Sequence, residues 1–195
     1  MKLPLNCEAE YHEGFLDLQE ANALFSQLSQ ILEEIAFQPE TIDGRKYEVN
    51  FGKIMFIDEE LMEKKAFPEQ FWGPTKVWFA ELRKLKEKIE EETGHTFQVC
   101  VLIHYPDGHS GVDFHSDYSA YGDTSLIPSI SLGEEREFQL REKASGDIFS
   151  QTLANGSLIV MGEHCQERYE HSLPVNPAYK NPRINLTFRK YGFEH

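Results

Sequence analysis

Residues 183–189 read Arg183-Ile184-Asn185-Leu186-Thr187-Phe188-Arg189, so polar and apolar side chains alternate without a break. Alternation with a period of two is typical of a β-strand that has one polar and one apolar face. Two guanidinium groups would then lie on the same face of one strand. Holding both inside a fold is costly unless an anion pairs with them, and the fork of N–H donors on Arg matches a carboxylate. We therefore expect this strand to meet a small dicarboxylate.

Short β-strands with turns between them are expected throughout the second half of the chain. The runs that predict them are residues 97–103, 127–132, 137–141, 148–153, 157–161, 169–173 and 183–191. Gly, Pro and Asn residues punctuate these runs, and many short strands in succession are typical of a sandwich or barrel. We expect an α+β, mainly β fold whose core, residues 96–191, is a double-stranded β-helix, also called a jelly roll.

Two N-terminal helices are expected to pack outside this core. Apolar residues recur at spacings of three and four over about residues 17–35 and again over about 75–93, as on amphipathic helices. Residues 9–16 suggest a short strand before the first helix. Between the helices, residues 46–57 suggest two short strands, or one hairpin with Gly52 in its turn.

The spacing of a histidine and an aspartate within the predicted core suggests that they bind a metal. His115 and Asp117 are two residues apart, so on a strand both side chains would point to the same side of the sheet. His171 follows 54 residues after Asp117. Two histidines and one carboxylate on one face of a metal form the facial triad of non-haem Fe(II) oxygenases, which leaves positions open for a cosubstrate and dioxygen. Taken singly each residue is commonplace, but together with the double-arginine strand they indicate a metal site.

The ordered set of motifs resembles the AlkB family of Fe(II)- and 2-oxoglutarate-dependent dioxygenases. The set comprises His115-x-Asp117, Ser129-Ile130-Ser131-Leu132-Gly133, residues 156–161, His171-Ser172-Leu173-Pro174 and residues 183–189. These motifs lie in the C-terminal half of the chain, and the upstream layout also looks like the family. An isolated His-x-Asp is a weak sign, whereas the ordered set that closes on the 183–189 strand is a strong one.

The resemblance implies roles for individual residues. Under it, the ligands of Fe(II) are His115, Asp117 and His171. Arg183 and Arg189 would bind the carboxylates of 2-oxoglutarate, and the residues that add hydrogen bonds are Asn185 and Tyr105. The bound metal would hold the cosubstrate and activate dioxygen, while the protein supplies ligation, orientation and exclusion of water.

The resemblance also implies a substrate lid over residues 38–75. In the family this region contributes aromatic side chains that stack on a base, and the candidates here are Phe51, Phe56 and Phe71. For any one of them a place in the core is the more common outcome, because buried Phe is frequent in proteins.

Two positions depart from the family pattern. Ile103 stands where family members usually carry Asn, two residues before the matching Tyr105, so one cosubstrate contact would be lost or replaced. Tyr118-Ser119 occupies the segment after His-x-Asp where the family tends to have an acidic residue that reads the target base. The second departure bears on base selectivity and on whether the substrate is a base.

Length and composition favour one packed domain, residues 1–195. Three cysteines at scattered spacings, Cys7, Cys100 and Cys165, are interpreted as reduced and predict an intracellular, cytoplasmic protein. The N-terminus lacks the apolar run of a secretory signal, and no stretch approaches the length of a membrane span. We expect a monomer with no membrane partner.

The formal net charge of −14 at pH 7 bears on the choice of substrate. A nucleic-acid binder usually has a basic surface, and an acidic chain repels phosphate at long range. The leading hypothesis is nevertheless oxidative N-demethylation of alkylated bases in single-stranded or flipped-base nucleic acid. A second hypothesis keeps this chemistry for a protein side chain or a small molecule. A third is a jelly-roll binding module that has lost turnover.

Overall fold

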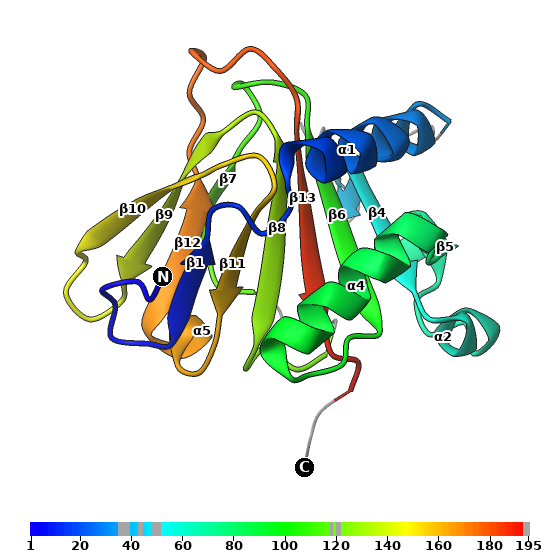
Figure 1. Cartoon of the computed structure of the whole chain (residues 1–195), viewed down its shortest axis with the longest axis horizontal. Helices are drawn as coiled ribbons and strands as arrows, with labels where there is room; N and C mark the ends of the chain where they lie inside the picture. The colour runs from blue at the N-terminus through cyan, green and yellow to red at the C-terminus, as the bar shows by residue number, and fades with distance from the viewer. Residues whose placement is uncertain (35–39, 43–44, 48–51, 118, 120–121, 193–195) are drawn as a thin grey trace.

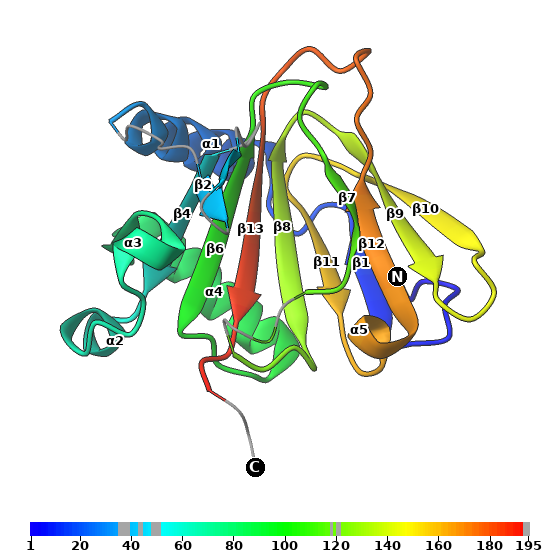
Figure 2. The same ribbon diagram turned by 180° about the vertical axis from the view of Figure 1, so that it is seen from behind.

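Two β-sheets dominate the computed structural model, which describes residues 1–34, 40–42, 45–47, 52–117, 119 and 122–192. The larger sheet has seven strands in the order β1-β11-β8-β13-β6-β4-β5, and the smaller has four in the order β10-β9-β12-β7. The smaller sheet lies on one face of the larger sheet and the long helices lie on the other (Figure 1 and Figure 2). Within the described part of the chain, strands β2 and β3 pair only with each other.

The strands are β1 (Ala9–His12), β2 (Glu40–Ile42), β3 (Arg45–Tyr47), β4 (Gly52–Ile57), β5 (Thr75–Val77), β6 (Val99–Tyr105), β7 (Val112–His115), β8 (Ile127–Gly133), β9 (Arg136–Glu142), β10 (Ile148–Leu153), β11 (Ser157–Met161), β12 (Tyr169–Leu173) and β13 (Arg183–Arg189). The helices are α1 (Leu18–Glu33), α2 (Glu59–Glu63), α3 (Glu69–Trp72), α4 (Ala80–Thr93) and α5 (Cys165–Arg168).

Strand β13 lies between β8 and β6 in the larger sheet. Its apolar residues Ile184, Leu186 and Phe188 are fully buried in the hydrophobic core that also contains the apolar side chains of α1 and α4. The residues between them, which point to the other face of the sheet, line a cavity: Arg183, Asn185, Thr187 and Arg189. The alternation predicted for this strand is therefore confirmed, and each of its two faces serves a different part of the molecule.

Helices α1 and α4 lie in front of the larger sheet in Figure 1 and behind it in Figure 2, so they cover the same face. Helix α1 begins with a capping box, in which Asp17 Oδ1 accepts from the Glu20 N–H (2.8 Å) and Glu20 Oε2 accepts from the Asp17 N–H (3.1 Å). Helix α4 ends before Gly94, whose φ of 70° lies in the left-handed region that glycine tolerates. The jelly-roll core with N-terminal helices outside is confirmed.

The segment before α4 differs from the prediction. Residues 75–77 form β5, which pairs parallel with β4, instead of the first turn of a helix. Two of these three residues are β-branched and favour an extended backbone, so the helix begins only at Ala80. Of the two alternatives for residues 46–57, two short strands agree with β3 and β4, whereas a hairpin that turns at Gly52 is wrong, because Gly52 is the first residue of β4 and pairs with His104 of β6.

The region expected to form a substrate lid contains two short helices, α2 and α3, that the sequence did not indicate. Phe56 is fully buried and packs edge-on against Phe79 in the main core, so its prediction as a base-stacking residue is wrong. Phe71 on α3 is 76% exposed and is accessible to a ligand. Phe51 lies outside the described residues.

Two further features bear on the sequence-based expectations. Cys7, Cys100 and Cys165 are all buried and have free thiols, and their redox state in the cell stays a prediction. In the described part of the chain, no helix has both the length and the apolar character needed to cross a membrane.

Arg136, at the start of β9, ties together the loops next to two strands of the smaller sheet. Its guanidinium is fully buried and donates to the carbonyl oxygens of Asp107 (3.2 Å), Ser110 (2.9 Å) and Pro174 (3.1 Å). It also lies 4.7 Å from the centre of the Tyr179 ring. Strand β7 begins shortly after Ser110 and β12 ends just before Pro174, so one side chain fixes the ends of both strands.

Substitution Arg136→Met should lower the free energy of unfolding by at least about 3 kcal/mol, because several buried carbonyl oxygens lose their donor. Urea denaturation followed by circular dichroism would measure the change. The matched control is Arg83→Met on the exposed side of α4, where a change within about 0.5 kcal/mol is expected. Equal effects of the two substitutions would contradict the role assigned to Arg136.

Candidate active site

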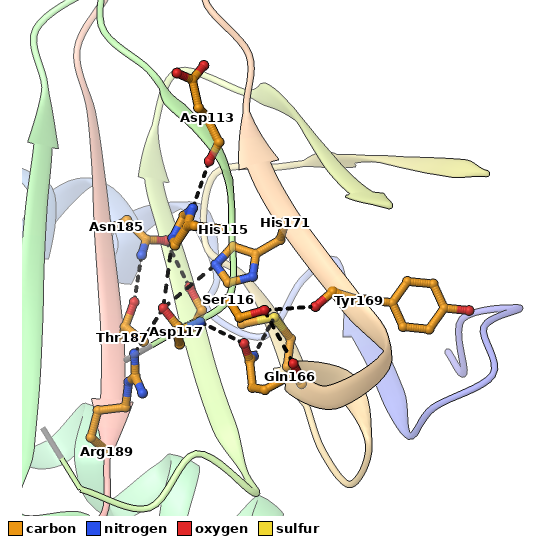
Figure 3. A network of polar contacts seen from close by, with 12 residues as sticks. Asp113, His115, Ser116, Asp117, Gln166, Tyr169, His171, Asn185, Thr187 and Arg189 are labelled. Atoms are coloured by element: carbon orange, nitrogen blue, oxygen red, sulfur yellow. Dashed lines mark hydrogen bonds and ion pairs between the residues drawn. The ribbon is translucent and has the colours of Figure 1, made fainter. Parts of the chain in front are cut away.

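Strands β7 and β12 bring two histidines together. His115 lies directly opposite His171 in the pairing of these strands, and the ring centroids are 4.3 Å apart. Asp117 Oδ1 is 3.9 Å from His115 Nε2 and 3.7 Å from His171 Nε2. The three potential ligand atoms lie within 4.8 Å of one another, which suits a single metal ion. Figure 3 shows the three side chains turned toward one another. The structure thus gathers the three residues that the sequence singled out as ligands.

A backbone carbonyl orients the ring of His115. Its Nδ1 lies 2.8 Å from the carbonyl oxygen of Asp113. A carbonyl only accepts hydrogen bonds, so Nδ1 carries the proton and Nε2, on the side of Asp117, keeps its lone pair. Metal-binding histidines commonly donate their other ring N–H in this way, which fixes both the tautomer and the ring orientation.

Burial keeps the second histidine neutral. Removal from water lowers the pKa of His171 to about 4, with smaller contributions in the same direction from His115 and Arg189, while Asp117 acts in the opposite direction. The imidazole is therefore uncharged at neutral pH and has a lone pair for a metal. Two imidazoles and one carboxylate are a donor set that fits Fe(II).

Asp117 is not held by the strand that carries His115, because β7 ends at His115. The expectation that a regular strand would present both side chains is therefore wrong, although the two still meet. Instead, the Asp117 N–H donates to Gln166 Oε1 on α5 (2.8 Å), and Asp117 Oδ1 lies 3.0 Å from Arg189 Nη2 (Figure 3). Neither contact was predicted. Gln166 belongs to a four-residue helix with no periodic pattern that could have revealed it.

Arg183 lies at one end of the polar face of β13, and Arg189 lies at the other end. Its side chain is buried, and its Nη2 donates to Ser131 Oγ (2.8 Å) and Asn185 Oδ1 (3.1 Å). Burial lowers the pKa of Arg183 to about 10, so the group still carries its charge at neutral pH. Its Nε has no hydrogen-bond partner, and no acidic side chain of the described residues pairs with it. A buried cation with only neutral partners is costly, and an anion would relieve that cost.

Polar side chains continue along the same face of β13. Asn185 Oδ1 also accepts from Ser129 Oγ (2.8 Å), and Asn185 Nδ2 donates to Thr187 Oγ1 (2.7 Å). Tyr105 of β6 lies with its ring centre 5.5 Å from the Arg183 guanidinium, and burial raises the pKa of its hydroxyl. All four residues expected at a cosubstrate site therefore line one surface.

A cavity of about 310 Å³ joins the histidines, Asp117 and the two arginines. Ile103 lines it and pairs with Asn185 in the neighbouring strand, so an apolar side chain stands where the resemblance implied a polar contact. Lys53 of β4 also lines the cavity and pairs with Ile103 on the other side. The sequence had not indicated Lys53. In the Tyr118-Ser119 segment, the second place where the chain departs from the family pattern, Ser119 is exposed and Tyr118 lies outside the described residues.

We compared the chain with known protein families and with individual proteins, and it is similar to Fe(II)-dependent oxygenases. The model of the 2OG-Fe(II) oxygenase superfamily matches residues 8–189. The human alpha-ketoglutarate-dependent dioxygenase alkB homolog 3 is 30% identical over 197 residues, covering 91% of this chain and 64% of that protein. The bovine DNA oxidative demethylase ALKBH2 is 34% identical over 126 residues, covering 59% of this chain and 45% of that protein. The chain thus spans less than two thirds of the length of these relatives.

Two solved structures share the fold. The structure of OsALKBH1 has a TM-score of 0.66 at 13% identity, covering 96% of this chain and all of that chain (100%). A prolyl-4-hydroxylase of Pseudomonas putida has a TM-score of 0.54 at 16% identity, covering 94% of this chain and 93% of that chain. Alpha-ketoglutarate is another name for 2-oxoglutarate, the cosubstrate that the family resemblance implied, and it is a small dicarboxylate of the kind that the two arginines suggested.

Substitution His115→Ala should weaken binding of a divalent metal by more than about 100-fold, because a directly bound ligand contributes more than the 10–100-fold typical of its hydrogen-bonding partners. Isothermal titration calorimetry of the metal-free protein with Co(II) measures the affinity. The control is His95→Ala, since His95 is exposed in the loop after α4 and should leave the affinity unchanged. Unchanged Co(II) affinity in His115→Ala would exclude the proposed metal position.

Proposed function

Because the chain belongs to the 2OG-Fe(II) oxygenase superfamily, and within it to the AlkB family, we propose that it is an Fe(II)- and 2-oxoglutarate-dependent dioxygenase that N-demethylates alkylated bases in nucleic acid. One observation carries the proposal: a single cavity has two histidines and a carboxylate at one end and, at the other, a charged, buried arginine that has no acidic partner among the described residues. A dicarboxylate that also reaches a metal would satisfy both ends.

The proposed reaction is balanced by its cosubstrates. When bound by His115, Asp117 and His171, Fe(II) would supply the activation of dioxygen. One oxygen atom ends in succinate, formed from 2-oxoglutarate with loss of carbon dioxide. The other is inserted into a C–H bond of the N-methyl group, and the resulting hydroxymethyl group leaves as formaldehyde while the base nitrogen regains a proton.

The residues of the cavity have distinct proposed tasks. Arg183 would bind a carboxylate of 2-oxoglutarate through its fork of donors, with Tyr105 and Asn185 fixing the plane of that fork. Arg189 lies at the metal end, since it contacts Asp117, and would take part in binding the other carboxylate there. Exclusion of water by the surrounding sheets would strengthen each of these interactions.

The nucleic-acid substrate is proposed on two grounds. One of the relatives is named a DNA oxidative demethylase. In addition, Lys53 lines the cavity, where a cation could meet a phosphate, and Phe71 is exposed within the region that the family resemblance assigns to the lid. We retain the expectation that the base must be unstacked or single-stranded to enter.

A protein side chain or a small molecule is the second candidate substrate. The net charge of −14 favours it, because an acidic chain attracts phosphate poorly, and so does the Tyr118-Ser119 segment. A salt titration separates the two candidates, since binding driven by phosphate contacts weakens steeply as salt rises. Binding of single-stranded DNA and RNA that is absent or insensitive to salt would favour the second candidate.

The direct test is succinate formation from 2-oxoglutarate with Fe(II), and formaldehyde release, with and without methylated single-stranded DNA. Turnover should be stimulated by the DNA and lost in His115→Ala. Iron-dependent turnover that ignores every methylated oligonucleotide would leave the oxygenase chemistry in place and reject the nucleic-acid substrate. Absence of any 2-oxoglutarate consumption, with iron and ascorbate present, would reject the enzyme and support a binding module.

Substitution Arg183→Lys should raise the KM for 2-oxoglutarate about tenfold or more, because one charge-assisted hydrogen bond is worth about 1.5–3 kcal/mol and Lys lacks the planar fork. Steady-state kinetics at varied 2-oxoglutarate measures it. Arg83→Lys, on exposed α4, is the control with unchanged KM. An effect on Co(II) affinity instead of on the KM would place Arg183 with the metal and not with the cosubstrate.

A further inference from the structure

Helix α5 lies directly beside the metal ligands although it contributes none of them (Figure 3). The chain reaches it through Gly162 and Glu163, whose backbones are hydrogen bonded to both sides of Glu8 (Gly162 N–H to Glu8 O, 2.6 Å; Glu8 N–H to Glu163 O, 3.0 Å). The Cys165 thiol also donates to the Glu8 carbonyl (3.2 Å). The short helix is therefore anchored to the N-terminal segment, in a fixed position relative to the sheet.

Gln166 of α5 makes two hydrogen bonds to the loop after β7 and a further contact to β11. Its Oε1 accepts from the Asp117 N–H (2.8 Å), and its backbone carbonyl accepts from Ser116 Oγ (3.3 Å). Its Nε2 lies 3.7 Å from Met161 Sδ, on the last residue of β11. The contact with Met161 sets the orientation of the amide, with the nitrogen toward sulfur and the oxygen toward Asp117.

These contacts replace a strand ladder that has already ended. Beyond His115 the backbone of residues 116 and 117 has no regular strand partner, although Asp117 must be placed within a few ångströms of two histidines. A partly buried N–H requires an acceptor, and here a side chain provides it. Arg189 holds the carboxylate of Asp117 from the opposite side. The ligand is therefore fixed at its backbone by one residue and at its side chain by another.

We propose that Gln166 is a positioning residue that holds Asp117 in the geometry for metal binding; this rests on the metal site of the proposed function. Its role does not depend on charge but on one acceptor atom, Oε1, at hydrogen-bond distance from the Asp117 N–H. Loss of that atom leaves the N–H without its partner and lets the ligand loop move, whereas retention of an oxygen at the same place preserves the geometry.

The test compares Gln166→Leu, which keeps the size of the side chain but has no acceptor, with Gln166→Glu, which keeps an oxygen at the same position. Metal-free protein is titrated with Co(II) alone by calorimetry, and the visible absorption of bound Co(II) reports its coordination. Gln166→Leu should bind Co(II) about 10–100-fold more weakly, with altered absorption. Gln166→Glu should stay within about threefold of wild type.

Controls separate positioning from folding. Glu167→Gln alters the neighbouring exposed residue of the same helix and should have wild-type Co(II) affinity. Circular dichroism melts of the metal-free variants show whether the protein as a whole remains folded. Wild-type affinity in Gln166→Leu, or equal loss in Gln166→Leu and Gln166→Glu, overturns the proposal. Because Co(II) binding is read without substrate, a protein that binds metal but does not demethylate rejects the proposed function alone.

Discussion

The two faces of β13 lie in environments that could hardly differ more. On one face, Ile184, Leu186 and Phe188 are sealed against the helix layer, and Phe188 stacks on Trp78 with ring centroids 6.1 Å apart. On the other, two arginines face a polar cavity. A slip of one residue in register would put guanidinium groups among leucines and apolar side chains against the metal ligands. Because that exchange is prohibitive, the hydrophobic core itself fixes where the arginines point.

The charged side chains that line the cavity are best considered together with the charges of the proposed metal and dicarboxylate. Arg189 is compensated by Asp117, whereas Arg183 has neutral partners, so the described protein groups leave a buried positive charge at one end. A divalent metal and a dicarboxylate bring equal and opposite charges. The pair could therefore enter a low-dielectric cavity without adding net charge, and each would lower the cost of burying the other. Metal binding and dicarboxylate binding would therefore depend on each other, and β13 contributes an arginine at each end of the cavity.

The sequence predicted those parts of the molecule whose position follows from a repeating pattern. Strand β13, strands β9, β10 and β12 of the smaller sheet, and the helix layer were predicted because burial imposes a period of two or of about 3.6 on their residues. Residues 75–77 escaped, since three residues are too few to show a period and the apolar helix pattern continues into them. Gln166 and the Arg189–Asp117 contact escaped for another reason: each joins residues far apart in the chain through a single polar atom, which leaves no trace in local composition.

The acidity of the chain and the cationic cavity act over different distances. Residues 1–34 hold seven acidic side chains against Lys2 alone, which accounts for six of the fourteen net negative charges. They lie on or around β1, at the far edge of the larger sheet, and α1, on the face away from the cavity. Three strand spacings separate β1 from β13, about 14 Å at 4.8 Å each. That exceeds the screening length of about 8 Å at physiological ionic strength, so the acidic side chains of residues 1–34 are largely screened from the arginines of β13.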